Sequence, residues 1–135
     1  MEAQPLLMCE DVVIENQRMS LVNLIDHINL LNVPGGIGNL TVFVRFESDE
    51  HLPQSFTLSI VSPSGREIAD GFCHLVRNTE TEVNAFITVP DFRVFEFGDH
   101  RVLIRILDGD VVAERLLSVR RKELPGRLAR MEPGE

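Results

Sequence analysis

The sequence predicts an all-β fold: an antiparallel β-sandwich of immunoglobulin-like or C2-like shape, with about eight strands. Short runs of alternating apolar and polar residues recur along the chain, as in strands that have one core face and one wet face. Turn residues separate these runs, and helical patterns are weak. Such a series is typical of a sandwich or a small barrel. The chain has no Trp, so the Cys–Trp–Cys signature of immunoglobulin domains is absent.

The first third of the chain contains one ambiguous stretch. Residues 11–15 form a first strand, and the polar residues 15–18 predict a turn after it. The following stretch, MSLVNLIDHINLLN, fits helical spacing as well as a long, bulged strand. We favour the strand because the neighbouring segments are strands and no good helix cap precedes it.

The alternation is clearest in the middle of the chain and near its end. The runs are residues 40–47, 55–61, 83–89 and 101–107, and each has a core face of Val, Ile, Leu, Ala or Phe. The segment 62–65, SPSG, predicts a tight turn in which Gly65 takes special backbone angles. Asp108-Gly109 predicts a two-residue type I′ hairpin turn with positive φ at both residues, because this pair suits the twist of hairpin strands.

The domain organisation follows from the charge and the turn residues. We expect one β-sandwich domain over residues 1–119 and a basic tail over residues 120–135 that either forms a short helix or has no fixed structure. The tail carries five basic and three acidic residues, a net charge of +2, so the body carries about −10 of a total of −8. An acidic body in a chain without Trp or Tyr as aromatic platforms disfavours binding to nucleic acids.

The chain shows no secretory signal and no membrane-spanning run, so we expect a cytoplasmic protein with reduced, structural cysteines at Cys9 and Cys73. No G-x-S-x-G motif is present, and PGGIGN at 34–39 is not a nucleotide-binding motif. Cys73 and His74 are neighbours on a strand and point to opposite faces, and the His and Cys residues lack zinc-site spacing. We therefore expect no enzyme activity, catalytic residue or cofactor.

An alternative function is binding of calcium or a small ligand. In an antiparallel sandwich alternate loops lie at the same end. The order of the predicted strands therefore places four acidic loops at one end: 15–18, 48–54, 77–82 and 108–110. The weak metal-ligand candidates are Asp49, Glu50, Asp108 and Asp110. Only 108–110 approaches the dense Asp pattern of C2 sites, so we expect little effect of calcium.

Some apolar side chains point away from the predicted core faces. Phe86 lies opposite Ala85 and Ile87, and Leu103 and Leu107 lie opposite the core face of their own strand. Either the tail or the segment 91–97 covers them, or another subunit does. Phe86, Leu103 and Leu107 are therefore the interface candidates, and a homodimer is the expected assembly.

Three segments resemble an uncharacterised family of small bacterial β-sandwich proteins. They are CEDVVIENQRMSLVNLIDHINL, SPSGREIADG and FGDHRVLIRILDGDVVAERLLSV, and the resemblance covers most of residues 6–119. It implies a sandwich and a bacterial cytoplasmic origin, with no established activity and no catalytic residues. The function that we expect is a non-enzymatic interaction or scaffold module that can self-associate, with an unknown protein partner.

Overall fold

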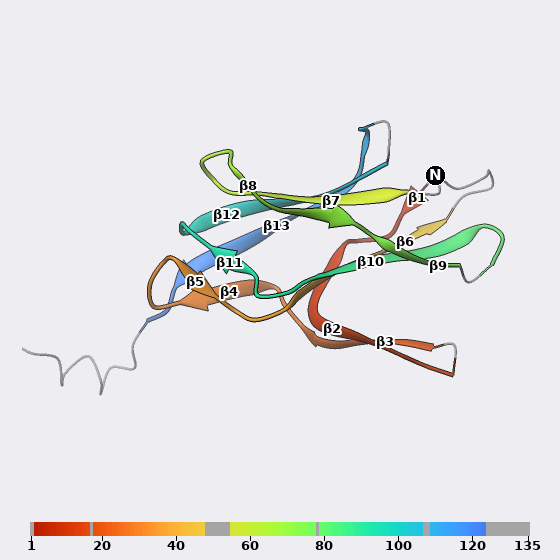
Figure 1. Ribbon diagram of the computed structural model, residues 1–135, viewed down its shortest axis with the longest axis horizontal. Helices are drawn as coiled ribbons and strands as arrows, with labels where there is room; N and C mark the ends of the chain where they lie inside the picture. The colour runs from red at the N-terminus through yellow and green to blue at the C-terminus, as the bar shows by residue number, and fades with distance from the viewer. Residues whose placement is uncertain (1, 17, 48–54, 78, 107–108, 124–135) are drawn as a thin grey trace, which may run out of the picture.

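The computed structural model describes residues 2–16, 18–47, 55–77, 79–106 and 109–123, and within these residues it contains strands and no helix (Figure 1). The predicted all-β class is therefore confirmed. Two sheets share one hydrophobic core, and a small ribbon lies at their end. The strands are numbered β1 to β13, which is more than the eight or so expected. Several of them are short, and the stretches 18–30 and 67–77 are each divided into one strand of each sheet.

The larger sheet, which we call sheet A, has the order β3-β2-β6-β10-β9, with β1 added beside β6. Its strands are β1 (Glu2–Ala3), β2 (Leu7–Glu15), β3 (Arg18–Leu24), β6 (Leu40–Glu47), β9 (His74–Arg77) and β10 (Glu82–Val89). All its pairings are antiparallel.

The second sheet, sheet B, has the order β4-β13-β12-β7-β8. Its strands are β4 (His27–Leu30), β7 (Phe56–Val61), β8 (Glu67–Phe72), β12 (Gly98–Ile106) and β13 (Val111–Arg121). The β4–β13 pairing is parallel and the others are antiparallel. The ribbon pairs β5 (Gly35–Gly36) with β11 (Arg93–Val94), so the glycine-rich segment forms a short strand.

The core lies between the two sheets, and alternation along each strand supplies it. β6 contributes Leu40, Val42, Val44 and Phe46, as its sequence predicts, and each is at most 1% exposed. Phe46 stacks on Phe56 of β7 with ring centroids 4.5 Å apart, which joins sheet A to sheet B. Buried aromatic side chains of this size contribute strongly to stability.

Two of the passages between the sheets are close corners, in which one strand follows another after one or two residues. The stretch 19–30 is strand, as expected, but it is divided: β3 ends at Leu24 in sheet A, and β4 begins at His27 in sheet B. Asn23 takes a φ of 55° near this bend. At the other corner β8 of sheet B passes through Cys73 into β9 of sheet A, and the Cys73 amide donates to the Phe56 carbonyl at 2.8 Å.

Two hairpins of sheet B close with the same three-residue loop. In the first, the Gly65 amide donates to the Ser62 carbonyl at 2.9 Å, and Gly65 has a φ of 90°. In the second, the Gly109 amide donates to the Ile106 carbonyl at 2.9 Å, and Gly109 has a φ of 97°. A turn followed by a glycine with positive φ is the usual three-residue hairpin.

The expected two-residue turn at Asp108-Gly109 is therefore wrong, because the loop spans residues 107–109. A β-bulge near Ile104 and Arg105 shifts the strand register, so Ile106 rather than Leu107 precedes the loop. Leu107 and Asp108 lie outside the described residues, as does the expected positive φ at Asp108.

The last strand extends slightly beyond the predicted domain boundary at 119. β13 ends at Arg121, whose guanidinium lies 4.7 Å from the centroid of the Phe97 ring and donates to the Leu31 carbonyl at 3.1 Å. The Lys122 amide donates to the Leu30 carbonyl at 2.7 Å. The rest of the predicted tail, from residue 124, is not among the described residues. The described part of the chain has no helix that is long and apolar enough to cross a membrane.

Candidate functional site

The distal half of the β2–β3 hairpin leaves sheet A as an arm, which we define as residues 11–15 and 18–22. β2 pairs with β6 only through Leu7, Met8 and Cys9, whereas residues 11–15 pair with β3 alone. In Figure 1 the hairpin runs below β10 and β9, and residues of the hairpin line a common pocket with residues of these two strands. An isolated two-stranded hairpin has little stability of its own, so the arm depends on contacts with the body.

One such contact joins the arm to the outer face of sheet A. Asn84 of β10 donates from Nδ2 to the Sδ of Met19 at 3.2 Å, which is a weak hydrogen bond. Asn84 is 1% exposed and Thr41 is 0% exposed, although alternation predicts both on a wet face. That prediction is wrong because β2 and the arm lie against this face; the Thr41 hydroxyl contacts the Glu10 carbonyl at 3.3 Å.

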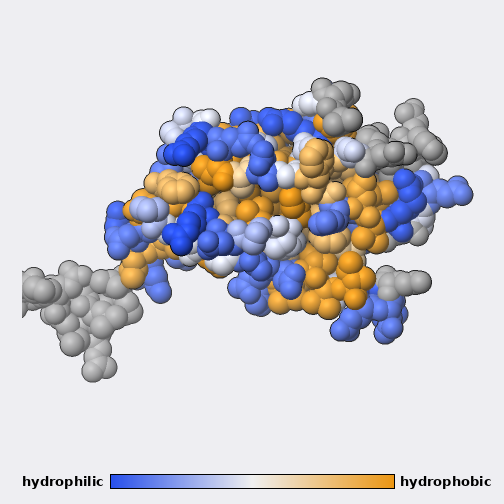
Figure 2. All heavy atoms as spheres, viewed as in Figure 1, coloured by the Kyte–Doolittle hydropathy of each residue, from blue (hydrophilic) through white to orange (hydrophobic). Residues whose placement is uncertain are grey.

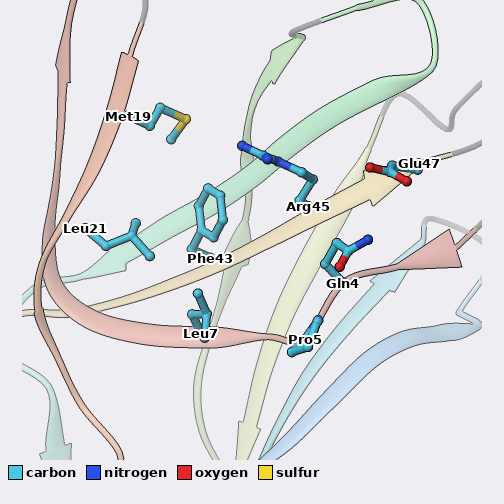
Figure 3. A pocket seen from close by; sticks show the side chains of 8 residues that line it. All are labelled: Gln4, Pro5, Leu7, Met19, Leu21, Phe43, Arg45 and Glu47. Atoms are coloured by element: carbon cyan, nitrogen blue, oxygen red, sulfur yellow. The ribbon is translucent and has the colours of Figure 1, made fainter.

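A groove lies between the arm and the outer face of sheet A, and one half of it is apolar. This half is a pocket of about 570 Å³. Its lining residues are Gln4, Pro5, Leu7, Met19, Leu21, Phe43, Arg45 and Glu47. Met19 and Leu21 of the arm point toward Phe43 on β6 (Figure 3). Figure 2 shows hydrophobic side chains gathered over the region of the arm.

The other half of the groove is basic. It is a second pocket, of about 900 Å³, that shares Met19 and Arg45 with the first. Its lining residues are Ile14, Arg18, Met19, Arg45, Val76, Arg77, Glu82 and Asn84. Three arginines therefore meet here against one acidic residue, in a chain whose net charge is −8.

Arg45 lies where the two halves meet. Its Nε donates to Oδ1 of Asn84 at 2.8 Å and lies 3.8 Å from a carboxylate oxygen of Glu82. Both contacts use Nε, so its two Nη nitrogens make no hydrogen bond with a described residue. Arg77 donates from Nη1 to the Glu80 carbonyl at 2.9 Å. With respect to the described residues, the two Nη nitrogens of Arg45 are therefore open to an oxygen acceptor, for which the planar guanidinium is suited.

The interface candidates of the sequence do not lie together. Phe86 is half-buried on the outer face of sheet A, with its ring 5.5 Å from that of His74. Leu103 belongs to β12 of sheet B, opposite Ser59 and Glu114, and is only 1% exposed. Leu107 is outside the described residues. Leu103 thus offers almost no surface to a partner, and Phe86 lies on the same sheet face as the groove.

The calcium candidates are not brought together in the described part of the chain. Asp49, Glu50 and Asp108 lie outside it, and the backbone carbonyl of Asp110 accepts from the Ile106 amide at 3.0 Å. The described residues contain no cluster of three His, Cys, Asp or Glu side chains that could hold a metal ion. Where the loops 15–18 and 77–82 approach each other, the basic half of the groove brings Arg18 and Arg77 together.

Both cysteines are free thiols. Burial raises the pKa of the Cys73 thiol to about 12, and burial is also the main reason why the pKa of Cys9 is raised. Raised values keep the thiols protonated and unreactive near neutral pH. This chemistry is what a packed, structural cysteine needs, and it does not activate a nucleophile.

The sequence pattern did not identify the residues of the groove as functional residues. Arg18, Arg45 and Arg77 stand on three strands that are far apart in the chain, and each follows ordinary polar spacing. The available signal was weak: alternation places Arg45 and Asn84 on one sheet face, but it does not show which segment lies over that face.

Comparison with known proteins gives a family and no function. A family model described as "Family of unknown function (DUF6941)" matches residues 4–120, which include the arm and all the residues that line the groove. No curated protein and no solved structure matches the chain.

Proposed function

The chain belongs to the DUF6941 family of unknown function, and from the groove we propose that it is a non-enzymatic interaction module for an extended segment of a partner protein. In this proposal the two sheets are a scaffold of the immunoglobulin-like or C2-like kind in a small bacterial, cytoplasmic protein. The single observation that carries the proposal is the position of the arm, which stands off sheet A and leaves a groove with an apolar half and a basic half.

The apolar half supplies a place for a hydrophobic side chain of the partner. Leu7, Leu21 and Phe43 line an open pocket at the surface. A concave apolar surface with a polar rim is typical of a protein interaction site. Burying one Leu or Phe side chain there contributes roughly 1.5–3 kcal/mol from removal of apolar surface from water.

The basic half determines the charge of the partner. Arg18, Arg45 and Arg77 face Glu82 there, so a carboxylate of the bound segment would gain attraction and would meet the two Nη nitrogens of Arg45. Arginine pairs with a carboxylate through two parallel hydrogen bonds. The segment that fits is therefore an extended one in which an apolar residue lies a few positions from an Asp or Glu.

The proposal can be tested by selection from a phage-displayed library of random twelve-residue peptides. We expect the selected peptides to share a Leu, Ile, Met or Phe close to an acidic residue. One such peptide, labelled with a fluorophore, then gives a dissociation constant by anisotropy. Leu21→Glu should weaken its binding at least about tenfold, roughly 1.4 kcal/mol, because it places a carboxylate in the apolar half.

The matched control is Leu116→Glu, which makes the same change at a half-exposed leucine of sheet B. It should leave the affinity unchanged, and Arg45→Gln should weaken acidic peptides but not their Asn or Gln versions. The proposal is wrong if selection gives no shared pattern, or if the two leucine variants bind the peptide equally well. Equal binding to Arg45→Gln would contradict the assignment of an acidic partner.

A further inference from the structure

The free edge of β3 differs from the other edges of the two sheets. Sheet A ends at β3 and β9, and sheet B ends at β4 and β8. β4 and β9 have four residues each, and β8 contains Glu67, Asp70 and Gly71. Short length and charged residues are the common ways in which an edge avoids pairing with another chain. β3 has seven residues, RMSLVNL, and Arg18 is its one charged residue.

The hairpin loop determines which backbone groups of β3 are free. Glu15 pairs with Arg18 across a two-residue loop, and the closing pair of such a loop exchanges both hydrogen bonds. The hydrogen-bonded pairs then alternate, so the N–H and C=O groups of Ser20 and Val22 point to β2. Those of Met19 and Leu21 point away from it, and they form no hydrogen bond to a described residue outside β2. An edge of this kind is a template for a further strand.

We propose that β3 pairs with β3 of a second copy of this chain, antiparallel and about a two-fold axis at Leu21. Leu21 is the middle residue of β3, so this register gives the longest overlap. It places Ser20 opposite the partner's Val22, and Arg18 opposite the partner's Leu24. Leu24 is 63% exposed, so the aliphatic stem of Arg18 would cover apolar surface that is now in water.

The charges of the arm do not oppose a second copy at this edge. The acidic residues of the hairpin, Glu10, Asp11 and Glu15, are on β2. Two-fold pairing puts the two β3 strands in the centre and the two β2 strands outside, about 14 Å apart at the usual strand spacing. That separation exceeds the Debye length of about 8 Å at physiological salt, so the acidic strands repel each other little. The two Arg18 side chains are six residues apart along the paired strands, roughly 20 Å.

The pairing does not require the proposed peptide binding. Its hydrogen bonds use backbone groups at the edge of the arm, whereas the groove binds through side chains. The Arg18 side chain alone takes part in both, because its stem would cover Leu24 of the second copy and it also lines the basic half of the groove. The interface adds one strand pair and is small, so we expect a dimer with a dissociation constant in the micromolar range.

The first test is the mass of the full chain in solution by light scattering, between about 5 and 200 µM, a range that spans the expected micromolar constant. We expect a shift from monomer to dimer. Leu21→Pro should abolish the dimer, because it removes an edge N–H without removing a bond to β2. Leu21→Ala keeps that N–H and should still dimerise. A monomer at the highest concentration, or a dimer that survives Leu21→Pro, overturns the proposal.

A second test does not depend on the fold of the proline variant. In a Cys73→Ser background, Leu21→Cys should form a disulfide-linked dimer under mild oxidation, because opposed residues of an antiparallel pair have Cα atoms about 5.5 Å apart. Arg18→Cys on the same strand is the matched control and should not crosslink to itself. Equal crosslinking of the two variants, or none at Leu21→Cys, overturns the two-fold register.

Discussion

The contact between Gly71 and Ile87 gives a sensitive test of how the two sheets pack. Gly71 lies in β8 of sheet B and Ile87 in β10 of sheet A. A Cβ atom on Gly71 would lie 2.5 Å from Cδ1 of Ile87, and the next atom, Cγ1 of the same side chain, would be 4.0 Å away. The absence of a side chain at residue 71 therefore allows the edge strand of sheet B to approach sheet A.

Two substitutions test this contact, and their effects should not add. Gly71→Ala forces the Ile87 methyl group to move by about 1 Å, and overpacking of this kind costs roughly 1–3 kcal/mol. Replacing Gly by Ala also lowers the conformational entropy of the unfolded chain, which stabilises the folded protein by about 0.4–1 kcal/mol. We expect a net loss of about 1 kcal/mol in the free energy of unfolding. Ile87→Val alone should cost about 1 kcal/mol through the cavity that it leaves.

The double variant Gly71→Ala/Ile87→Val should be no less stable than Ile87→Val alone. Valine lacks Cδ1, so the alanine methyl group at residue 71 fills the cavity that Ile87→Val leaves. Both the cost of overpacking and the cost of the cavity then fall. The chain has no Trp and no Tyr, so urea unfolding is followed by far-ultraviolet circular dichroism. A loss of 1 kcal/mol lowers the midpoint by roughly 0.5 M at a typical slope. Effects that add within about 0.5 kcal/mol would show that β8 does not lie against β10.

Three further predictions concern a turn, a thiol and a metal. Gly109→Val should lower the free energy of unfolding by about 1 kcal/mol or more, because valine resists a φ of 97°; an unchanged urea midpoint would contradict the turn. Burial raises the pKa of Cys73 in the folded protein to about 12, above the ordinary thiol value of 9.0, so stability should fall as pH rises from 9 toward 12. Cys73→Ala should flatten that part of the stability curve, and an unchanged slope would refute the assignment. Millimolar calcium should leave the melting temperature unchanged, whereas a rise of several degrees with calcium and not with magnesium would identify a site in the acidic loops.

Most of the strands could be predicted because their alternation is local. The run 40–47 coincides with β6, and its Leu, Val and Phe side chains form the core as expected. A glycine in a short polar segment also predicts a turn from local sequence, and Gly65 takes the special backbone angles predicted for it. These features depend on period and backbone sterics, which residues close together in the chain determine.

The remaining features depend on contacts between distant segments. Alternation separates the two faces of a strand, but it cannot show that Met19 of the arm lies over Asn84 or that Glu10 of β2 lies over Thr41. Asp108-Gly109 fits a two-residue or a three-residue loop, and a bulge at Val112 of β13 decides between them. Leu103 faces away from the core, as predicted, but its burial depends on neighbouring strands. The groove was missed for the same reason, because its floor and its arm come from different parts of the chain.

The two ends of the described chain differ in their distance from the groove. Gln4 and Pro5 line its apolar half, whereas residues 121–123 leave the body at the opposite end of the molecule (Figure 1). A candidate partner sequence joined ahead of residue 2 by a short flexible linker would therefore be held beside the groove at a millimolar effective concentration. Segments that bind too weakly to be detected when free would then occupy it, and a fluorophore or affinity tag attached after residue 123 would not compete with them.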